Sequence, residues 1–449
     1  ICLNKDGYTQ QSQRYVPVKE QAYVVPEEIR GTSFESEYTR INDKLVSLYN
    51  TMSKEKKGQN RGRGAGPDKY VFGIPIEDAR YILPVSTKTN IFTTMSGDKA
   101  VDFVRLLKQQ PQAEARHLAA DFLKSLDNKG LEEAIDFITD QGHIDTDATY
   151  ESFKPMLDQI DKNAVLYDTF NNPIHRVALG GVTSTNPKTP SEVYSKWDPE
   201  FETAKNPELF GKNPDMKKKF NDHLMSEIGK ADEIVKSMIE NNPDEFKDRI
   251  FLEWLSSLNP DTRATNIAEK ILGYGHESIS EHARHVYGSE QSLTSFHQFE
   301  RHRLPVNYVE PFEKIPVDRD VFVPPTVKKN NEMHNLYREA VEEAKQFREK
   351  LIDNGYEEAA SYLLLNADGV KVITNSNARI DRQMLEQRTC DNAQWEIRDR
   401  AQSIIGLLKD TVPYMYKRAG PPCTKGDCPE GSLSCGNMKS KRKYYGFSG

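Results

Sequence analysis

Cysteine, long apolar runs and excess positive charge are all scarce in this sequence. Its 449 residues include 5 cysteines, of which Cys2 and Cys390 stand alone and the others lie near the C-terminus. An odd number without regular spacing argues against a disulfide framework and favours a reducing cytoplasm. Apolar stretches such as 362–365 are far shorter than the roughly 20 residues that a membrane-spanning helix needs. We therefore expect a soluble, cytoplasmic protein.

The charge balance narrows the choice of partners. The formal net charge is -7 at pH 7, whereas a protein that holds nucleic acid over its whole surface needs a surplus of basic residues. Any anion site must then be a local cluster of arginines. The sequence begins at Ile1 rather than at a methionine, so we expect that an N-terminal segment is missing, and no secretion signal is visible in this sequence.

What is present suits a large α+β protein. A chain of 449 residues can form two or three domains, and 29% charged with 37% hydrophobic residues is ordinary for a globular protein with much solvated helix surface. Four segments are predicted: a helix-rich first half over 1–142, a linker over 143–165, a second half over 166–420, and a cysteine-containing tail over 421–449. Each half is expected to hold a small sheet.

Hydrophobic periodicity gives the expected elements. Tyr38, Ile41 and Leu45 recur at helical spacing within 36–53, which predicts an amphipathic helix. A second long helix is expected over 329–353, with Leu336, Ala340, Phe347 and Leu351 on its inner side. The remaining expected elements are helices over 97–139 (broken near 127–130), 215–257, 264–273, 280–300 and 378–408 (one or two helices), a buried strand at 175–179, polar connecting chain over 143–165 and irregular chain over 304–328.

A basic, glycine-rich stretch interrupts the first half at 54–67. Its sequence KEKKGQNRGRGAGP cannot pack into a core, so a loop is expected. It lacks the lysine and hydroxyl that follow the last glycine of a phosphate-binding loop. Two interpretations remain, a solvated loop or a contact with an anion or RNA. An RNA-binding protein is the weakest function considered, because no aromatic stacking platform adjoins the segment.

Three polar segments carry candidate binding chemistry. The first is the triplet Arg301, His302 and Arg303, which concentrates positive charge and hydrogen-bond donors suited to a phosphate or pyrophosphate. Taken alone, the triplet could equally complement the dipole of a helix C-terminus. Upstream, His276 and His282 lack a third ligand at metal spacing, so no metal site is expected.

The other two segments are also rich in donors. Residues 388–398 read RTCDNAQWEIR and follow Asn377, Arg379 and Gln383; a bend between them would bring several donors to one heteroaromatic ring and its phosphate. Residues 9–15 read TQQSQRY, a run of donors that suits a loop around an anion. Alone, these segments are a charged helix and a polar loop.

Together the segments resemble the flavin-dependent thymidylate synthases. Members of that family carry Gly-His-x-Ser/Thr-x-x-Glu-His, Gln-x-x-Arg-His-Arg, Ser-x-Arg-Tyr, Ala-Arg before an apolar run ending in Leu-Pro, Asn-Ala-Arg, and Leu-Arg-x4-Ala-Gln-x-Glu-Ile-Arg. The second half matches at 275–282, 298–303, 377–379 and 388–398, with Gln387 where leucine is usual. The first half matches at 10–15 and 78–84. The resemblance implies two fused copies of the family domain.

The second half departs from the family pattern at positions that the first half keeps. Pro311 and Glu313 replace the serine and arginine of Ser-x-Arg, and Ser361 replaces the arginine of Ala-Arg.

The first half shows the reverse. Residues 2–4 replace Arg-His-Arg, and Leu106 replaces the arginine of Leu-Arg if 112–116 aligns with 394–398. Between the Ser-x-Arg and Ala-Arg positions the first half is longer than the second by about the length of the basic loop. We therefore interpret the loop as an insertion. Each half therefore lacks what the other keeps.

The resemblance implies one working site divided between the halves, because family members place their active sites between subunits. A homodimer of pseudodimers is expected, with small-molecule substrates and neither membrane nor nucleic-acid partners. The implied dUMP site draws on both halves: Gln10, Ser12, Arg14, Arg80, Gln298, Arg301 and Arg388. The implied FAD site draws on the second half: Ser278, Arg301, His302, Arg303, Asn377, Arg379 and Gln383.

The implied reaction is the reductive methylation of dUMP to dTMP, with methylenetetrahydrofolate as carbon donor, FAD as cofactor and NADPH as reductant. Arg388 is the implied catalytic residue, because a guanidinium beside the pyrimidine stabilises negative charge on the ring. The family does not use a thiolate such as Cys390. Cys423, Cys428 and Cys435 are expected to be either thiols or zinc ligands. The competing interpretation is a pseudoenzyme that binds flavin or nucleotide and acts as a scaffold.

Overall fold

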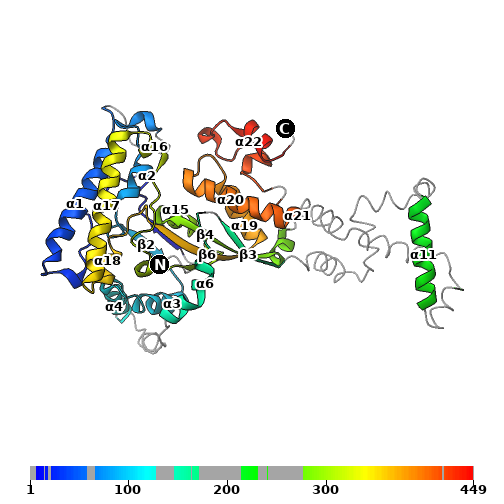
Figure 1. Ribbon diagram of the computed structural model, residues 1–449, viewed down its shortest axis with the longest axis horizontal. Coiled ribbons are helices and arrows are strands. Elements are labelled where there is room, and N and C mark those ends of the chain that lie inside the picture. The colour runs from blue at the N-terminus through cyan, green and yellow to red at the C-terminus, as the bar shows by residue number, and fades with distance from the viewer. Residues whose placement is uncertain are drawn as a thin grey trace. The chain divides into compact units, whose positions relative to one another are not determined.

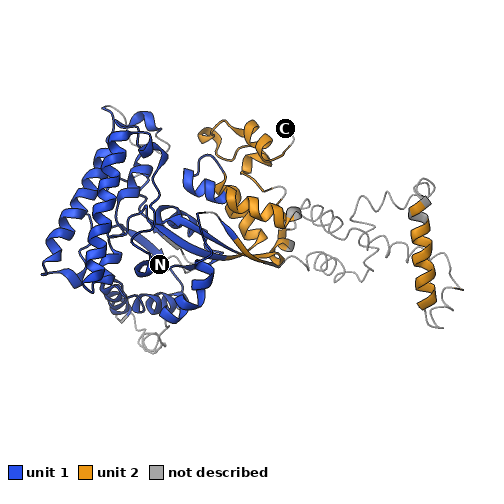
Figure 2. Ribbon diagram, in the orientation of Figure 1, with its two compact units in different colours: residues 1–165, 287–374, 390–401 blue, residues 166–286, 375–389, 402–449 orange. Residues whose placement is uncertain are grey.

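The chain forms two compact units that each combine distant parts of the sequence. The computed structural model describes residues 7–14, 16–18, 22–57, 66–127, 146–162, 164–170, 214–230, 240, 277–416 and 419–447. Unit 1 comprises 1–165, 287–374 and 390–401, and unit 2 comprises 166–286, 375–389 and 402–449 (Figure 2). Unit 1 therefore draws on both sequence halves. The sequence-based domain boundaries stay a prediction.

Two long helices, one from each sequence half, form the core of unit 1. α1 (Phe34–Met52) packs along α17 (Asn331–Asp353) (Figure 1). Both helices bury the face on which apolar residues recur every three or four positions, and Tyr38 and Tyr337 are fully buried. The two predicted helices are confirmed. The inner face of α17 was misjudged at one position, because Leu336 is 38% exposed and its neighbour Tyr337 points inward instead.

Local sequence signals set the ends of α17. At its start, Asn330 Oδ1 accepts a hydrogen bond from the Met333 backbone N–H at 3.1 Å, which is a side-chain N-cap. At its end, Gly355 has a φ of 78°, and the Tyr356 N–H donates to the Leu351 carbonyl oxygen at 3.0 Å. A left-handed residue at this place is the usual helix stop and favours glycine.

Shorter helices complete unit 1. They are η1 (Glu27–Ile29), η2 (Pro67–Lys69), α2 (Ile76–Ala79), η3 (Arg80–Ile82), α3 (Gly97–Lys108), α4 (Ala113–Asp127), α6 (Thr146–Leu157), α15 (Leu293–Phe299), η5 (Phe312–Lys314), α16 (Pro325–Lys328) and α18 (Glu357–Ser361). The range 304–328, which was expected to be irregular, contains η5, α16 and a four-residue strand at Val306–Val309. Residues 58–65 of the basic loop lie outside the described residues.

Two helix predictions in the first half need correction. A break that was not expected separates α3 from α4 at 109–112, whereas 128–139, which contains most of the break expected near 127–130, lies outside the described residues. The expected polar connection contains α6, whose Phe153 stacks on Tyr308 with ring centroids 3.9 Å apart. α6 also buries Leu157. A single short apolar face was therefore enough to make this segment helical.

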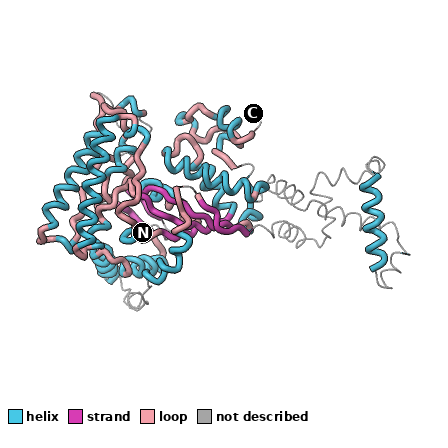
Figure 3. The backbone as a smooth tube through the Cα atoms, viewed as in Figure 1, coloured by secondary structure: helices cyan, strands magenta, loops and turns pink. Residues whose placement is uncertain are grey.

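The described residues contain two small sheets, which confirms the α+β, helix-rich class (Figure 3). β1 (Gly7–Gln10) pairs antiparallel with β2 (Ile91–Thr94), with Gly7 opposite Thr94. The second sheet has the order β3-β4-β6-β5. Its strands are β3 (Val165–Phe170), β4 (Arg284–Ser292), β6 (Gly369–Asn377) and β5 (Val306–Val309). The strand predicted at 175–179 lies outside the described residues.

The helix predicted over 280–300 is wrong across its middle. That segment forms a short 3-10 helix, then β4, and only then α15. β4 is an inner strand and is buried along most of its length, so it lacks the alternation of apolar and polar residues that marks a strand with one solvated face. Its buried residues are mostly polar, among them His285, Ser289 and Gln291, so no apolar run marks the strand in the sequence either.

The remaining helices belong wholly or partly to unit 2. They are α11 (Pro214–Lys230), η4 (Glu277–His282), α19 (Ala378–Arg388), α20 (Trp395–Thr411), α21 (Pro413–Tyr416), η6 (Pro422–Thr424), η7 (Gly431–Leu433) and α22 (Met438–Tyr444). The helical range predicted over 378–408 is confirmed as α19 and α20. α11 confirms the start of the helix predicted over 215–257; almost all the rest of that range, and 264–273, lie outside the described residues.

Candidate functional site

A short turn in unit 1 positions Arg80. α2 gives way at Arg80 to η3, and the chain that follows pairs with a segment of the second half. Asn366 N–H donates to the Leu83 carbonyl oxygen at 2.8 Å, and Val85 N–H donates to the Leu364 carbonyl oxygen at 2.7 Å. These bonds anchor η3 at its C-terminal side. The Arg80 side chain lies in the interior and is only 8% exposed.

Gln394 connects Arg80 to Gln298. Its Oε1 accepts hydrogen bonds from Arg80 Nη2 at 2.8 Å and from Gln298 Nε2 at 2.7 Å. Its Nε2 donates to the Glu77 carbonyl oxygen at 2.9 Å. All of these groups are buried or half-buried, and Gln394 itself is 4% exposed. Two of the predicted site residues, one from each sequence half, thus lie in one hydrogen-bond network.

Arg14 joins this network from the N-terminal loop. Its Nε and Nη2 donate to Glu77 Oε2 at 2.8 and 2.6 Å, and its backbone N–H donates to Ser12 Oγ at 3.3 Å. Gln10 ends β1 with an exposed side chain. The structure therefore gathers Ser12, Arg14 and the Arg80 network, whereas Gln10 stays at the surface.

Two arginines, Arg14 and Arg80, and two carboxylates, Glu77 and Asp78, lie in or beside this network. Burial is the main cause that lowers the pKa of Arg80, and the like charge of Arg14 lowers it further. Arg80 Nε donates weakly to the Glu77 carbonyl oxygen at 3.3 Å, and no described residue accepts a hydrogen bond from Nη1. Arg14 pairs with the Glu77 carboxylate, whereas Arg80 donates, among the described residues, only to uncharged oxygen atoms, so its guanidinium can still bind an added anion.

Asp78 adds a titratable group beside this network. Burial raises the pKa of its carboxyl to about 6, and the negative charge of Glu77 acts in the same direction. Thr326 Oγ1 donates to Asp78 Oδ2 at 2.6 Å, which partly offsets the cost of burying the charge. Asp78 is therefore a carboxylate at neutral pH and becomes neutral in mild acid.

A reciprocal set of contacts relates the two sequence halves within unit 1. Tyr81 OH donates to Glu396 Oε2 at 2.7 Å, and at the matching positions Tyr362 OH donates to Glu114 Oε2 at 3.3 Å. The short helices repeat this exchange, since η1 packs on α18 and α2 packs on α16. Each half thus supplies a tyrosine to a carboxylate of the other, as the alignment of 112–116 with 394–398 predicts.

The reciprocal set lacks the arginine. Where Gln394 accepts from Arg80, Gln112 instead donates from Nε2 to Ser361 Oγ at 3.2 Å. Leu106 occupies the position that the alignment matches with Arg388. The two arrangements therefore share their architecture and differ in charge.

The Arg-His-Arg triplet directly follows α15, the helix that carries Gln298. Arg301 is exposed, while His302 and Arg303 are half-buried. The His302 N–H donates to the Phe299 carbonyl oxygen at 3.0 Å, so the chain turns immediately after the helix. Both interpretations of the triplet, an anion contact and a complement to the helix dipole, agree with this position.

Four predicted FAD residues lie in unit 2 on η4 and α19, which pack on each other. Ser278 is exposed on η4, and Gln383 is exposed on α19. Asn377 Oδ1 caps α19 by accepting from the Ile380 N–H at 3.1 Å, and the Arg379 guanidinium forms an ion pair with Glu281. Hydroxyl, amide and guanidinium donors therefore gather on one part of unit 2.

Arg388 is the last residue of α19 and is half-buried. It belongs to unit 2, whereas Ser12, Arg14, Arg80 and Gln298 belong to unit 1.

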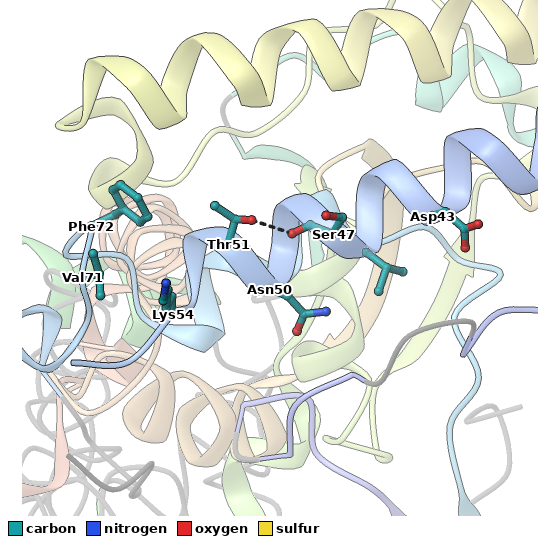
Figure 4. A pocket seen from close by; sticks show the side chains of 8 residues that line it. Asp43, Ser47, Asn50, Thr51, Lys54, Val71 and Phe72 are labelled. Carbon is teal, nitrogen blue, oxygen red and sulfur yellow. Dashed lines mark hydrogen bonds between the residues drawn. The ribbon is translucent and has the colours of Figure 1, made fainter. Parts of the chain in front are cut away.

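Of two surface cavities in the described part of unit 1, only the smaller is lined by neighbours of a predicted site residue. A cavity of about 560 Å³ runs along α1 and is lined by Asp43, Lys54 and Phe72 among others (Figure 4). None of the predicted site residues lines it. A smaller cavity of about 270 Å³ is lined by Gln11 and Gln13, the neighbours of Ser12, so the N-terminal loop borders a hollow on its outer side.

The described residues contain no candidate metal site, disulfide or membrane-spanning helix. No group of three His, Cys, Asp or Glu side chains gathers there closely enough to hold a metal ion, and none of the described cysteines forms a disulfide. Whether the tail cysteines are thiols or bind zinc with a further ligand stays open. None of the helices in these ranges combines the length and the hydropathy needed to cross a membrane.

Sequence reasoning quoted the Gln-x-Glu of 394–396 as a motif and gave its members no role. Gln394 joins the predicted residues, and Glu396 accepts from Tyr81 OH and from Ser292 Oγ at 2.6 Å. Both residues could have been noticed in the sequence. Gln394 and Glu396 flank the apolar Trp395 at the start of α20, and later residues of that helix are buried. Glu77 carried no comparable signal.

Comparison with known proteins identifies the family to which the chain belongs. A family model described as thymidylate synthase complementing protein matches residues 7–129 and 223–414, and the chain belongs to this family. It is 30% identical over 206 residues to a flavin-dependent thymidylate synthase of Clostridium tetani, covering 41% of this chain and 82% of the relative. It is 33% identical over 187 residues to that of Geobacter sulfurreducens, covering 40% and 80%. With that of Thermococcus onnurineus it shares 35% over 176 residues, covering 36% and 72%.

Proposed function

We propose that the chain catalyses the FAD-dependent reductive methylation of dUMP to dTMP, with methylenetetrahydrofolate and NADPH as co-substrates. The active site is one composite site to which both sequence halves contribute. The observation that carries this proposal is the buried network in which Gln394 joins Arg80 of the first half to Gln298 of the second. The names of the relatives support the reaction class.

The arginines of the network suit the phosphate of dUMP. Arg80 is buried, has a lowered pKa and keeps Nη1 for an external acceptor. A phosphate would relieve the repulsion between Arg80 and Arg14 and accept charge-assisted hydrogen bonds from both. Arg14 would then exchange part of its contact with Glu77 for the substrate. Ser12, Arg301 and Gln298 complete the proposed dUMP contacts, and Gln10 would have to turn inward to contribute.

The donor set fits FAD. Ser278, Arg379 and Gln383 present a hydroxyl, a guanidinium and an amide on η4 and α19, and such groups bind pyrophosphate and flavin heteroatoms. Asn377 uses its Oδ1 for the helix cap and keeps its Nδ2 as a donor. The Arg301 triplet would supply further cations. When bound, FAD supplies the carrier for the one-carbon unit and for the hydride that the reaction requires.

We assign Arg388 to the pyrimidine. A guanidinium beside N3 and O2 would stabilise negative charge that develops on the ring during methylation. The phosphate-binding arginines would hold the nucleotide in the pose that this requires. No cysteine nucleophile is part of the proposal.

The other arrangement within unit 1 is proposed to be inactive. Ser361, Glu313 and Leu106 stand at the positions matched with Arg80, Arg14 and Arg388, so none of them offers a positive charge to a phosphate. One site per chain is therefore expected, and a dimer of chains would hold two.

The test is a flavin and turnover assay on the purified full-length protein. Absorbance gives the FAD content, and dTMP is then measured after addition of dUMP, NADPH and methylenetetrahydrofolate. FAD binding with dTMP formation supports the enzyme. FAD binding without any dTMP would favour the scaffold pseudoenzyme, and the absence of flavin after reconstitution would refute both.

A further inference from the structure

We propose that Gln394 is a positioning residue: it fixes the Arg80 guanidinium and the Gln298 amide in one arrangement before an anionic nucleotide binds. The identity of the nucleotide rests on the proposed function, whereas the positioning role rests on the geometry of unit 1. No role for Gln394 follows from the sequence pattern alone.

The orientation of the Gln394 amide is determined by its partners. An arginine side chain can only donate hydrogen bonds, and a backbone carbonyl oxygen can only accept them. Oε1 must therefore face Arg80 Nη2, and Nε2 must face the Glu77 carbonyl oxygen, as observed at 2.8 and 2.9 Å. A flipped amide would place N–H against N–H and oxygen against oxygen. The assignment of nitrogen and oxygen, which is often ambiguous for glutamine, is fixed here by chemistry.

This orientation carries over to Gln298. Because Gln394 presents an acceptor, Gln298 meets it with Nε2, at 2.7 Å. The same Nε2 donates to the Thr294 carbonyl oxygen of its own helix at 3.3 Å. The amide of a second-half residue is thus oriented by an arginine of the first half through one buried side chain.

The backbone beneath Gln394 is also anchored. Its carbonyl oxygen accepts from the Arg398 N–H at 3.1 Å, which begins α20. Two residues further on, Glu396 Oε1 accepts from the Ser292 N–H at 2.7 Å, and its Oε2 accepts from Tyr81 OH. A side chain that is buried, fully bonded and held at its base is preorganised, and preorganised contacts place a ligand without a further cost of ordering.

The chain contains a matched control. Gln112 occupies the reciprocal position and donates only to the Ser361 hydroxyl at 3.2 Å, with no guanidinium to orient. Loss of the Gln112 amide is expected to affect folding stability alone. Loss of the Gln394 amide is expected to affect ligand binding as well.

Two substitutions separate positioning from packing. Gln394→Met keeps the approximate volume and removes both polar atoms, so Arg80 Nη2 and Gln298 Nε2 lose their common acceptor. Gln394→Glu keeps the acceptor for Arg80, replaces the Nε2 donor with a second acceptor that faces the Glu77 carbonyl oxygen, and adds a charge that pairs with Arg80 and competes with a phosphate. We expect the Kd for dUMP to rise about 10-fold in Gln394→Met, the equivalent of about one lost hydrogen bond to a charged group, and to rise further in Gln394→Glu.

The experiment measures dUMP binding by isothermal titration calorimetry on the full-length flavoprotein, together with kcat and KM. The expected result is a higher Kd and a lower kcat for both Gln394 variants and no change for Gln112→Met. Values for Gln394→Met within twofold of the parent protein would overturn the inference and leave the proposed function intact. A smaller effect of Gln394→Glu than of Gln394→Met would also contradict it.

A second measurement needs no ligand. Thermal unfolding is compared for Arg80→Met, Gln394→Met and the double variant. If Gln394 holds Arg80, the shifts in Tm are non-additive, because the second substitution removes a contact that the first has already lost. Additive shifts would refute the positioning role. This result decides the inference even if the parent protein binds no dUMP, an outcome that would count against the proposed function alone.

Discussion

Replacement of Arg80 by methionine tests the composite site at its most buried cation. The substitution keeps an unbranched side chain of similar length and removes the charge. A hydrogen bond to a charged group contributes about 1.5–3 kcal/mol, and each 1.4 kcal/mol corresponds to a factor of about 10 in Kd. Loss of one bond from Nη1 to the phosphate is therefore expected to weaken dUMP binding roughly 10- to 150-fold.

The stability of the ligand-free protein should respond differently. Burial lowers the pKa of Arg80, which means that the folded protein carries a cost for this charge. The Gln394 acceptor also keeps its bond from Gln298 in the variant. We therefore expect the Tm of Arg80→Met without ligand to stay the same or rise, while dUMP binding is weakened. A residue that is retained at a cost in stability is typical of a functional site.

The assay combines calorimetric titration with dUMP and thermal unfolding without it. The matched control is Ser361→Ala, which changes the reciprocal position and should leave dUMP binding unaltered. Unchanged binding in Arg80→Met, or weakened binding in Ser361→Ala, would refute the assignment of the phosphate to the Arg80 side of unit 1.

Further predictions concern catalysis, pH and folding. Arg388→Ala is expected to retain FAD and abolish dTMP formation, and near-normal turnover would contradict its role. Burial raises the pKa of Asp78 to about 6, so the folded state binds this proton more tightly than the unfolded state. The contribution of Asp78 to the free energy of unfolding is therefore fully present below about pH 4 and is lost as the pH rises through 6. Asp78→Asn should remove that dependence and stabilise the protein by up to about 3 kcal/mol at pH 7, and a denaturant midpoint that falls at pH 7 would contradict this. Tyr81→Phe should lower the free energy of unfolding by about 1.5–3 kcal/mol, because it removes a 2.7 Å hydrogen bond to buried Glu396. Tyr362→Phe should lower it by less, because its hydrogen bond is 3.3 Å long. An equal or reversed order in urea unfolding would count against the reciprocal arrangement.

The long helices and the paired motifs were predictable, since both leave strong patterns in the sequence. α1 and α17 repeat apolar residues at helical spacing, and the motifs around Arg80 and Gln298 keep their residue types. β4 was mistaken for a helix, because a strand buried on both faces shows no alternation. α6 was missed because its apolar face is short and depends on Tyr308 from a distant strand.

The contacts that assemble the site could not be read from the sequence. Gln394 is separated from Arg80 and from Gln298 by long stretches of chain, and a neutral glutamine gives no local sign that it will be buried between two donors. The divided arrangement was inferred from which motif residues each half retains. The geometry adds what the motifs lack, namely which atoms of Arg80, Gln298 and Glu77 meet, and through which side chain.

The most direct test of the central claim is the stoichiometry of dUMP binding to the FAD-loaded full-length protein, measured by calorimetry. One composite site per chain predicts one dUMP bound per chain, with dUMP binding weakened at least about 10-fold when Arg80 of the first half or Arg388 of the second is replaced. Two equivalents per chain, or a dUMP affinity that is unchanged by the loss of either arginine, would contradict a single site divided between the two halves.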